Sequence, residues 1–270
     1  MTWFSALRKN SSVAQSERSG SATNAADSDP APSLPAEPPP GSPPADPRNA
    51  FIRRVVPGKT FIDIGGLSNV IYERVSVAAE AGAAAIAMMD VEGPSCPWWP
   101  QLHARLQSKG IVLPCECISG DITVEEIRPF DVVLSSGVLY HLPSPMLYLE
   151  KLRKVTKEYC ILVSSTIARK IESDFGTLTL PESGLIFVPA LADNEKRIIV
   201  DWFQKGGRGD ITESEERFGG HRNLRNYYPN WFFPTVPAFR AMAECAGFDI
   251  EDEAPVEPND LSYALLLRPI

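Results

Sequence analysis

Long apolar runs are missing from this chain of 270 residues. No stretch approaches the roughly 18 consecutive apolar residues of a membrane-spanning helix. The first nine residues contain an apolar part that is too short for a secretory signal, and it precedes the charged residues instead of following them. We therefore expect no membrane span, and we expect the protein in the cytoplasm.

Cysteine is scarce as well, with five residues and no Cys-x-x-Cys pair. Four of the five lie in or beside apolar segments, which is typical of reduced, buried thiols. No group of histidine, cysteine and carboxylate residues has the spacing of metal ligands, and no Gly-x-Ser-x-Gly motif or other nucleophile triad is present. The sequence thus predicts neither a disulfide framework nor a metal site.

Basic residues are outnumbered, because 26 lysines and arginines stand against 34 aspartates and glutamates, for a formal net charge of −8. A protein that binds a phosphate backbone needs a basic face. This charge balance argues against nucleic acid as a partner and favours a small-molecule substrate.

Proline is concentrated in one segment, Pro30–Pro47, where it occupies nine of 18 positions. The other residues there are mostly Ala, Ser, Asp and Glu, and such a segment cannot bury enough apolar surface to offset the entropy of ordering it. We therefore expect residues 1–50 to form a disordered tail. Residues 51–270 are enough for one α/β domain with a sizeable core.

Apolar runs alternate with helical patterns from Thr60 onward, which is typical of βαβ units and a parallel sheet. Residues 166–234 interrupt this alternation and are expected to form a lid-like insertion. Helices are expected from about Asn69, before Gly110, after Ser144 and over Val236–Ala246. The expected strands, of which the last two pair antiparallel, are Thr60–Ile64, Ala84–Asp90, Val112–Ile118, Phe130–Ser135, Glu158–Ser164, Phe248–Glu251 and Ser262–Arg268.

The first strand ends in Asp63-Ile64-Gly65-Gly66, at the edge of the sheet where ligands bind in this class of fold. Glycine permits a tight turn and a close approach of a ligand to the backbone. A dinucleotide site would require Gly-x-Gly-x-x-Gly, but Leu67 and Val70 occupy the second and third glycine positions. An acid in this turn suits the ammonium or ribose of S-adenosylmethionine better than a diphosphate. The alternative is a plain βα turn, in which Asp63, Gly65 and Gly66 bind no ligand.

Two further acids follow the next strands. Asp90, with Val91 after it, ends the second strand, where its carboxylate can accept hydrogen bonds from both ribose hydroxyls. Asp121, with Ile122 after it, follows the third strand and can accept a hydrogen bond from an adenine amino group. Each acid also has an alternative role. Asp90 can be a solvated acid at the end of a strand, and Asp121 can cap the turn of residues 124–127.

The fourth strand leads into Ser135-Ser136-Gly137-Val138-Leu139-Tyr140-His141, the most specific pattern in the chain. The run resembles the methyltransferase motif after the fourth strand, where the backbone and a Tyr or His face both cofactor and substrate, and this resemblance makes Ser136 a candidate cofactor contact. His141 can serve as a general base or as a structural hydrogen-bonding residue, and the sequence leaves both roles open. Tyr140 and His141 are the candidates for catalysis.

The segment 196–234 is rich in basic and aromatic residues. An insertion of this composition above the ligand-binding edge favours a lid over the substrate. The alternative is a packed crossover whose aromatic side chains reach the core. The candidates for substrate contact are Trp202, Tyr228, Trp231 and Phe232.

Residues 58–268 resemble a class I S-adenosylmethionine-dependent methyltransferase, and within that class the wobble-uridine carboxymethyltransferase-like subgroup. The resemblance implies a Rossmann-like, seven-stranded sheet that is mostly parallel, with an antiparallel last strand and helices on both faces. The motifs behind it are Gly137–His141 with Ser144-Pro145, Leu224-Arg225-Asn226-x-Tyr228, Phe233–Thr235 and Cys245–Phe248. The cofactor contacts that it implies are Asp63, Gly65, Asp90, Asp121, Ser136 and Tyr140.

This chain departs from the subgroup in three respects. Leu67 and Asn69 stand in place of two glycines of the first motif, and the expected tail stands in place of a helical extension. The subgroup holds the extra carboxylate of a carboxylated cofactor with basic residues before its first and last strands, where this chain has linker and Ser262. We therefore expect ordinary S-adenosylmethionine and methyl transfer to a small molecule, such as a sugar or a secondary metabolite. The alternatives are a tRNA-modifying (carboxy)methyltransferase and a non-catalytic, cofactor-binding scaffold protein.

Overall fold

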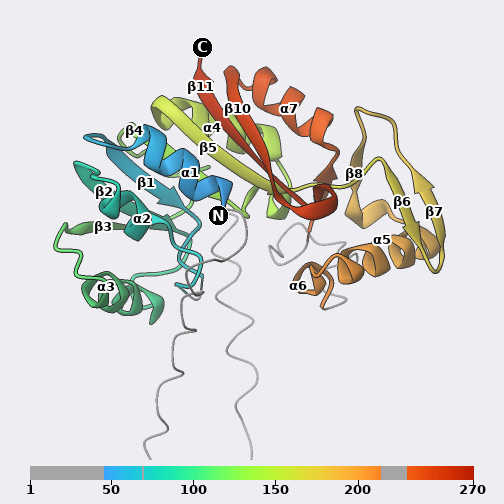
Figure 1. Cartoon of the computed structure of the whole chain (residues 1–270), viewed down its shortest axis with the longest axis horizontal. Coiled ribbons are helices and arrows are strands. Elements are labelled where there is room, and N and C mark those ends of the chain that lie inside the picture. The colour runs from blue at the N-terminus through green and yellow to red at the C-terminus, as the bar shows by residue number, and fades with distance from the viewer. Residues whose placement is uncertain (1–45, 69, 214–229) are drawn as a thin grey trace, which may run out of the picture.

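The structure, a computed structural model, describes residues 46–68, 70–213 and 230–270. Figure 1 shows this part of the chain as a central sheet between helices, with a smaller group of strands and helices at one end. Residues 1–45 of the expected tail, the helix start at Asn69 and the substrate candidate Tyr228 lie outside the described residues.

A seven-stranded sheet forms the centre of the molecule, in the order β10-β11-β5-β4-β1-β2-β3. Strands β1 to β5 run parallel, whereas β11 is antiparallel to both of its neighbours, β5 and β10. The expected Rossmann-like topology is confirmed, and the carboxyl ends of five parallel strands meet at one edge. The strands are β1 (Thr60–Ile64), β2 (Ala85–Asp90), β3 (Cys115–Ser119), β4 (Phe130–Ser136), β5 (Thr156–Ser165), β10 (Phe248–Glu257) and β11 (Ser262–Pro269).

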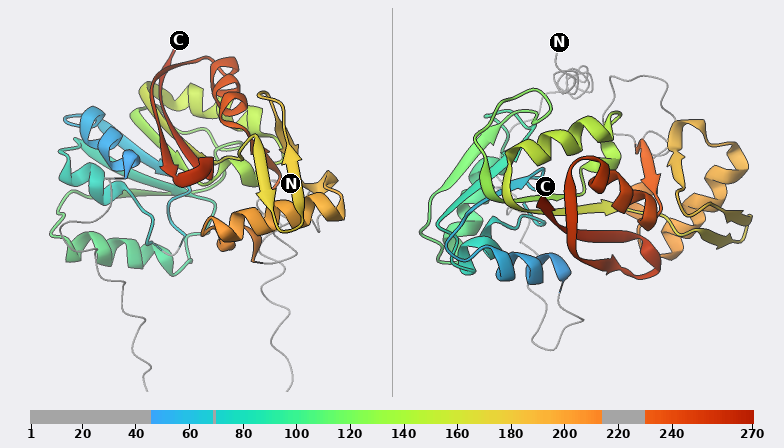
Figure 2. Two further views of the ribbon diagram at one scale, coloured as in Figure 1. Left: turned by 45° about the vertical axis from the view of Figure 1, so that its right-hand side comes forward. Right: turned by 90° about the horizontal axis from the view of Figure 1, so that it is seen from above.

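Both faces of the sheet are covered by helices, so β1 and β4 are buried along most of their length. Successive side chains of a strand point to opposite faces. Phe61 accordingly packs into one apolar cluster and Ile62 into the other. Figure 2 shows α1 and α4 on opposite sides of the sheet. The first layer contains α1 (Pro47–Val55), α2 (Val75–Glu80) and α3 (Trp98–Ser108), and the second contains α4 (Pro145–Val155) and α7 (Val236–Cys245).

The chain between β5 and α7, termed the insertion, forms short strands and helices, with residues 214–229 outside the described part. It has an apolar core of its own around Phe203 and Phe233, which also receives Leu261 from the β10–β11 connection. The insertion is therefore attached to the sheet by packing as well as by the chain. Its elements are β6 (Lys170–Ser173), β7 (Gly176–Thr179), β8 (Leu185–Phe187), α5 (Asp193–Lys205), α6 (Gly209–Thr212) and β9 (Phe232–Pro234), joined in part by the single turn η3 (Val188–Ala190).

The helix expected from Asn69 begins later, at Val75. Residues 70–74 are loop, and Val70 adopts a left-handed backbone with φ of +56°. The reason is tertiary: the buried Glu73 carboxylate accepts hydrogen bonds from the Ser76 backbone N–H (2.8 Å) and hydroxyl (2.7 Å) and pairs with Arg105 of α3. A capping interaction at Glu73 thus places the start of α2.

Residues 46–50, which the sequence places in the tail, belong to the folded structure. Asp46 is the N-cap of α1, and its carboxylate accepts a hydrogen bond from the Arg48 backbone N–H at 3.0 Å. Pro47 occupies the first helical position, where its fixed φ favours a helix and no N–H is needed. Phe51 and Ile52 are buried against the sheet. The proline-rich composition therefore gave a wrong prediction at Pro47, where α1 begins.

The third strand also begins later than expected, at Cys115 instead of Val112. Val112 is 96% exposed, so its apolar side chain is not part of the core. Among the described residues, β3 lies at the edge of the sheet and pairs only with β2. Because β2 is the strand that β3 pairs with, β3 begins at Cys115, the first residue that pairs with β2, opposite Ile86.

The position of Trp231 generates a first prediction. Its side chain is 4% exposed, and its ring stacks on Phe187 with 6.2 Å between centroids. Trp231→Ala should therefore lower the free energy of unfolding by about 3–5 kcal/mol. Denaturant unfolding measures this, with the half-buried neighbour Phe232→Ala as the milder control. A Trp231→Ala protein with unchanged stability but lost turnover would contradict a core role and support a substrate contact.

Candidate active site

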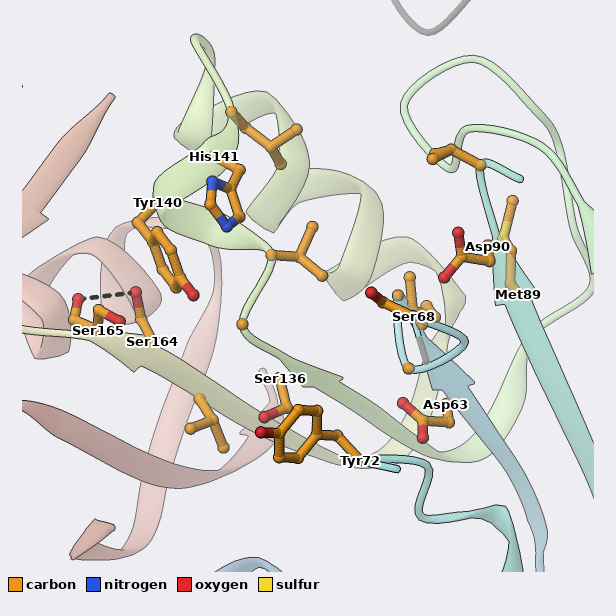
Figure 3. A pocket seen from close by; sticks show the side chains of 18 of the residues that line it. Asp63, Ser68, Tyr72, Met89, Asp90, Ser136, Tyr140, His141, Ser164 and Ser165 are labelled. Atoms are coloured by element: carbon orange, nitrogen blue, oxygen red, sulfur yellow. Dashed lines mark hydrogen bonds between the residues drawn. The ribbon is translucent and has the colours of Figure 1, made fainter. Parts of the chain in front are cut away.

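A cavity of about 790 Å³ lies at the carboxyl edge of the parallel strands. Figure 3 shows its wall, with Asp63 and Asp90 on one side and Tyr140, His141, Ser164 and Ser165 on the other. The cavity thus connects the ends of β1 and β2 with the ends of β4 and β5. Predicted site residues that line it are Asp63, Gly65, Gly66, Asp90, Val91, Asp121, Ile122, Ser136, Tyr140 and His141.

The Gly65-Gly66 turn requires glycine at both positions. Gly65 has a left-handed φ of +84°, and a Cβ there would lie 2.3 Å from a methyl group of Val138. A Cβ on Gly66 would lie 2.4 Å from the carboxylate of Asp63. The backbone of this turn can therefore pass close to the loop after β4 and to the strand-end acid, as a ligand-binding turn needs.

Asp63 ends β1 as a buried acid, with 1% of its surface exposed. One oxygen, Oδ2, accepts a hydrogen bond from the Arg74 backbone N–H at 2.9 Å, which closes the loop after β1. The other, Oδ1, has no partner among the described residues. Burial raises the pKa of Asp63 to about 7. A cationic donor from a ligand would satisfy Oδ1 and stabilise the charged form.

Asp90 ends β2 and is 8% exposed. Its two oxygens accept long hydrogen bonds of 3.2 Å from the backbone N–H groups of Leu67 and Glu92. Burial raises the pKa of this carboxyl group. A carboxylate oxygen can accept more than one hydrogen bond, so Asp90 retains capacity for a pair of hydroxyl donors in the cavity.

The two oxygens of the Asp121 carboxylate have different surroundings. Its Oδ1 accepts hydrogen bonds from the backbone N–H and the hydroxyl of Thr123, each at 2.8 Å, which orders the turn that follows. Its Oδ2 is buried without a partner among the described residues. Burial raises the pKa of Asp121 as well. One oxygen thus supports the turn, and the other can accept a hydrogen bond from a ligand.

The turn after β4 places Tyr140 and His141 on the 3₁₀ turn η2 (Leu139–His141), with their ring centroids 4.2 Å apart. Burial raises the pKa of Tyr140, and its hydroxyl interacts with Ser165 and Arg208. The phenol therefore stays protonated near neutral pH. His141 is half-buried and lines the cavity.

The cavity also contains residues that the sequence did not single out. Arg48 of α1 lines it and donates a hydrogen bond from Nη1 to the Ser136 hydroxyl at 3.2 Å. A basic residue therefore stands before the first strand, where linker was expected. Arg208 lines the insertion side and forms ion pairs at 2.9 Å with Asp210 and Glu257. The one sequence signal that could have indicated Arg48 is its position within the helix α1, which the sequence did not predict.

The three described substrate candidates do not form part of the cavity wall. Trp202 of α5 packs edge-on against Phe203, with 5.0 Å between ring centroids. Trp231 is buried, and Phe232 lies in β9. None of the three is among the residues that line the cavity. Their roles in substrate binding stay predictions.

Two negative findings apply to residues 46–68, 70–213 and 230–270. No group of three or more histidine, cysteine, aspartate or glutamate side chains there is arranged to hold a metal ion. No helix in these ranges is long and apolar enough to cross a membrane.

Comparison with solved structures identifies the fold. A mitomycin 7-O-methyltransferase matches 83% of this chain and 53% of its own, with a TM-score of 0.50 and 15% identity. An O-methyltransferase family 2 protein from Planctomyces limnophilus, in complex with apigenin, reaches a TM-score of 0.51 at 13% identity over 82% of this chain and 56% of its own. The chain has the class I methyltransferase fold. A magnesium protoporphyrin IX methyltransferase from Synechocystis PCC 6803, with bound SAH, shares it at a TM-score of 0.50 and 14% identity, over 83% of this chain and 82% of its own.

Curated sequences related to this methyltransferase-fold chain are named tRNA U34 carboxymethyltransferase. The protein from Psychrobacter arcticus is 28% identical over 174 residues, which cover 57% of this chain and 45% of that protein. The protein from Chromohalobacter salexigens is 26% identical over 169 residues, 59% of this chain and 47% of its own length. The chain thus spans less than half the length of these relatives. No family model matches it.

The raised pKa of Asp63 generates a prediction for cofactor binding to the methyltransferase fold. If an ammonium group pairs with Asp63, binding requires the carboxylate, which is the minor form below pH 7. The affinity for S-adenosylhomocysteine should then increase about tenfold between pH 6 and pH 8. Calorimetric titration at several pH values measures this. Asp63→Asn should remove the dependence, and an affinity that is independent of pH in the unmodified protein would contradict the pairing.

Asp90 generates a second prediction at this site. Asp90→Ala removes a charged acceptor whose hydrogen bonds are each worth roughly 1.5–3 kcal/mol. The affinity for S-adenosylhomocysteine should fall at least about tenfold, measured by calorimetric titration. The melting temperature shows whether the loss of the Leu67 contact disturbs the fold. Unchanged affinity in a folded Asp90→Ala protein would exclude Asp90 from the ribose site.

Proposed function

We propose that this chain binds S-adenosylmethionine or a derivative of it and transfers the group on the sulfonium to an acceptor. The observation that supports this most is the row of three acids at the ends of adjacent strands around one cavity. Two of them, Asp63 and Asp121, each have a buried carboxylate oxygen without a partner among the described residues. Buried acceptors without donors are costly, and the cofactor has donors of the required kinds.

The residues present fit the cofactor end to end. Asp63 would accept from its ammonium group, Asp90 from the ribose hydroxyls and Asp121 from the adenine amino group. Gly65 and Gly66 let the amino-acid part pass close to the backbone, since a side chain at either position would collide with its neighbours. When bound, the cofactor supplies an electrophilic carbon on a positively charged sulfur.

The contribution of the chain to the reaction is chiefly positioning, because group transfer is an in-line displacement. The hydroxyl of Tyr140 and the ring of His141 line the cavity at the end of β4. If the acceptor is a hydroxyl group, His141 would take its proton. An amine or an activated carbon would need no base.

For the acceptor, the relatives favour the tRNA alternative over the small molecule expected from the charge. Arg48 adds a second argument, because it places a guanidinium at the cavity beside Ser136. A basic residue before the first strand is what the carboxymethyltransferase-like subgroup uses to hold a carboxylated cofactor. We propose carboxymethyl transfer to a wobble uridine as the leading candidate and methyl transfer to a small molecule as the second.

Cofactor binding and turnover test the proposal together. We expect calorimetric binding of S-adenosylmethionine and of its carboxylated derivative. Arg48→Gln should lower the affinity for the carboxylated cofactor at least about tenfold more than the affinity for ordinary S-adenosylmethionine. Arg54→Gln is the matched control, because Arg54 lies on the same helix and pairs with Asp252 as Arg48 pairs with Asp46, but Arg54 does not line the cavity. Equal effects of Arg48→Gln on both cofactors would favour ordinary methyl transfer.

The acceptor is tested with the same protein and labelled cofactor. Label transfer to unmodified tRNA supports the leading candidate, and transfer to a tRNA-free extract of small molecules supports the second. Binding without any transfer would indicate a non-catalytic scaffold protein. Failure to bind either cofactor would reject the proposal as a whole.

A further inference from the structure

Tyr72 presents a large aromatic side chain at the cavity without burying it. It is 66% exposed, whereas Tyr140 and Tyr148, which also line the cavity, are 8% and 1% exposed. Figure 3 shows the Tyr72 ring extending from the loop after β1 toward Ser136. An exposed aromatic ring in a cavity wall is a surface that a ligand can cover.

The backbone on both sides of Tyr72 is held by the strand-end acids. The Leu67 N–H donates to Asp90 at 3.2 Å, and the Arg74 N–H donates to Asp63 at 2.9 Å. The Arg74 guanidinium in turn donates to the carbonyl oxygen of Tyr72 at 2.8 Å. Val70, 1% exposed, anchors the middle of the loop in the core. The ring therefore projects from a segment whose position is tied to the two acids.

The same two acids define where the reacting sulfur of the cofactor would lie. In S-adenosylmethionine the sulfur joins the amino-acid part to the ribose. If Asp63 holds the first and Asp90 the second, the sulfur lies between them, on the side of the cavity from which Tyr72 projects. The Tyr72 ring extends toward Ser136 in Figure 3, and the chain after Ser136, the last residue of β4, leads to Tyr140 in η2.

The charges around the cavity favour a cation. Its lining includes two guanidinium groups, those of Arg48 and Arg208. Against them stand the carboxylates of Asp63, Asp90, Glu92, Asp121, Asp210 and Glu257. None of the carboxylates belongs to the segment of residues 67–72, where Tyr72 instead offers the face of a neutral ring. Aromatic faces attract cations, most strongly when water is excluded.

We propose that the Tyr72 ring covers the sulfonium of the bound cofactor through a cation–π contact. This inference rests on the proposed function. It gives the chain a means to distinguish the charged donor, S-adenosylmethionine, from the neutral product, S-adenosylhomocysteine. Because the contact is lost when the sulfonium becomes a thioether, it holds the donor more tightly than the product and so assists product release.

Calorimetric titration of the full chain with both compounds tests the contact without any acceptor. Tyr72→Leu should lower the affinity for S-adenosylmethionine roughly threefold to thirtyfold. It should lower the affinity for S-adenosylhomocysteine by no more than about twofold. Tyr72→Phe should bind both as the unmodified chain does. For an analogue with an ammonium group in place of the sulfonium, Tyr72→Leu should lower the affinity as much as it does for S-adenosylmethionine.

Ile71→Ala is the matched control, because Ile71 is the neighbouring loop residue, is 39% exposed and does not line the cavity. It should leave the ratio of the two affinities unchanged. Equal weakening of donor and product by Tyr72→Leu, or a changed ratio in Ile71→Ala, would overturn the inference. If the unmodified chain binds neither compound, the proposed function fails instead. Melting temperatures confirm that the exposed substitutions leave the fold intact.

Discussion

The buried carboxylate of Asp63 is the constraint on which the rest of the site depends. It lies at the end of β1 with 1% of its surface exposed, and one of its oxygens accepts the Arg74 backbone N–H. Gly66 must lack a side chain because this carboxylate occupies the space. Asp63 therefore helps to set the course of the loop after β1, and burial raises the pKa of Asp63 to about 7. The protein tolerates this cost at the point where a cationic ligand would remove it.

The two halves of the cavity are built in different ways. The half with the acids comes from short segments directly after β1, β2 and β3, so it follows from the parallel sheet itself. The half around Tyr140 is completed by Arg208, which the insertion supplies and which pairs with Glu257 at the end of β10. A Cβ on Gly206 would lie 2.4 Å from Leu261, so this turn lies flush against the β10–β11 connection. The half with the acids thus follows from the parallel sheet, and the half around Tyr140 depends on the insertion.

Local patterns predicted the sheet well. β1 has the expected bounds, β4 differs by one residue, and the last two strands pair antiparallel. These features depend on short apolar runs and on glycine or proline nearby, which act within a few residues. The predicted start of α2 was wrong because Glu73 is held by Arg105, which is 32 residues away in the sequence. The start of α1 was missed because burial of Phe51 and Ile52, not composition, decides that segment.

The sequence by itself determined that acids and glycines follow the strands of a parallel sheet, since strand ends are local features. It could not determine which side chains from elsewhere face those acids. Arg48 reaches Ser136 across 88 residues of sequence, and Arg208 meets Glu257 across 49. Tyr72 carries no local signal, because its exposure depends on a loop that Asp63 and Asp90 hold through long-range hydrogen bonds. Only the tertiary structure decided these contacts, because each depends on how separate elements pack.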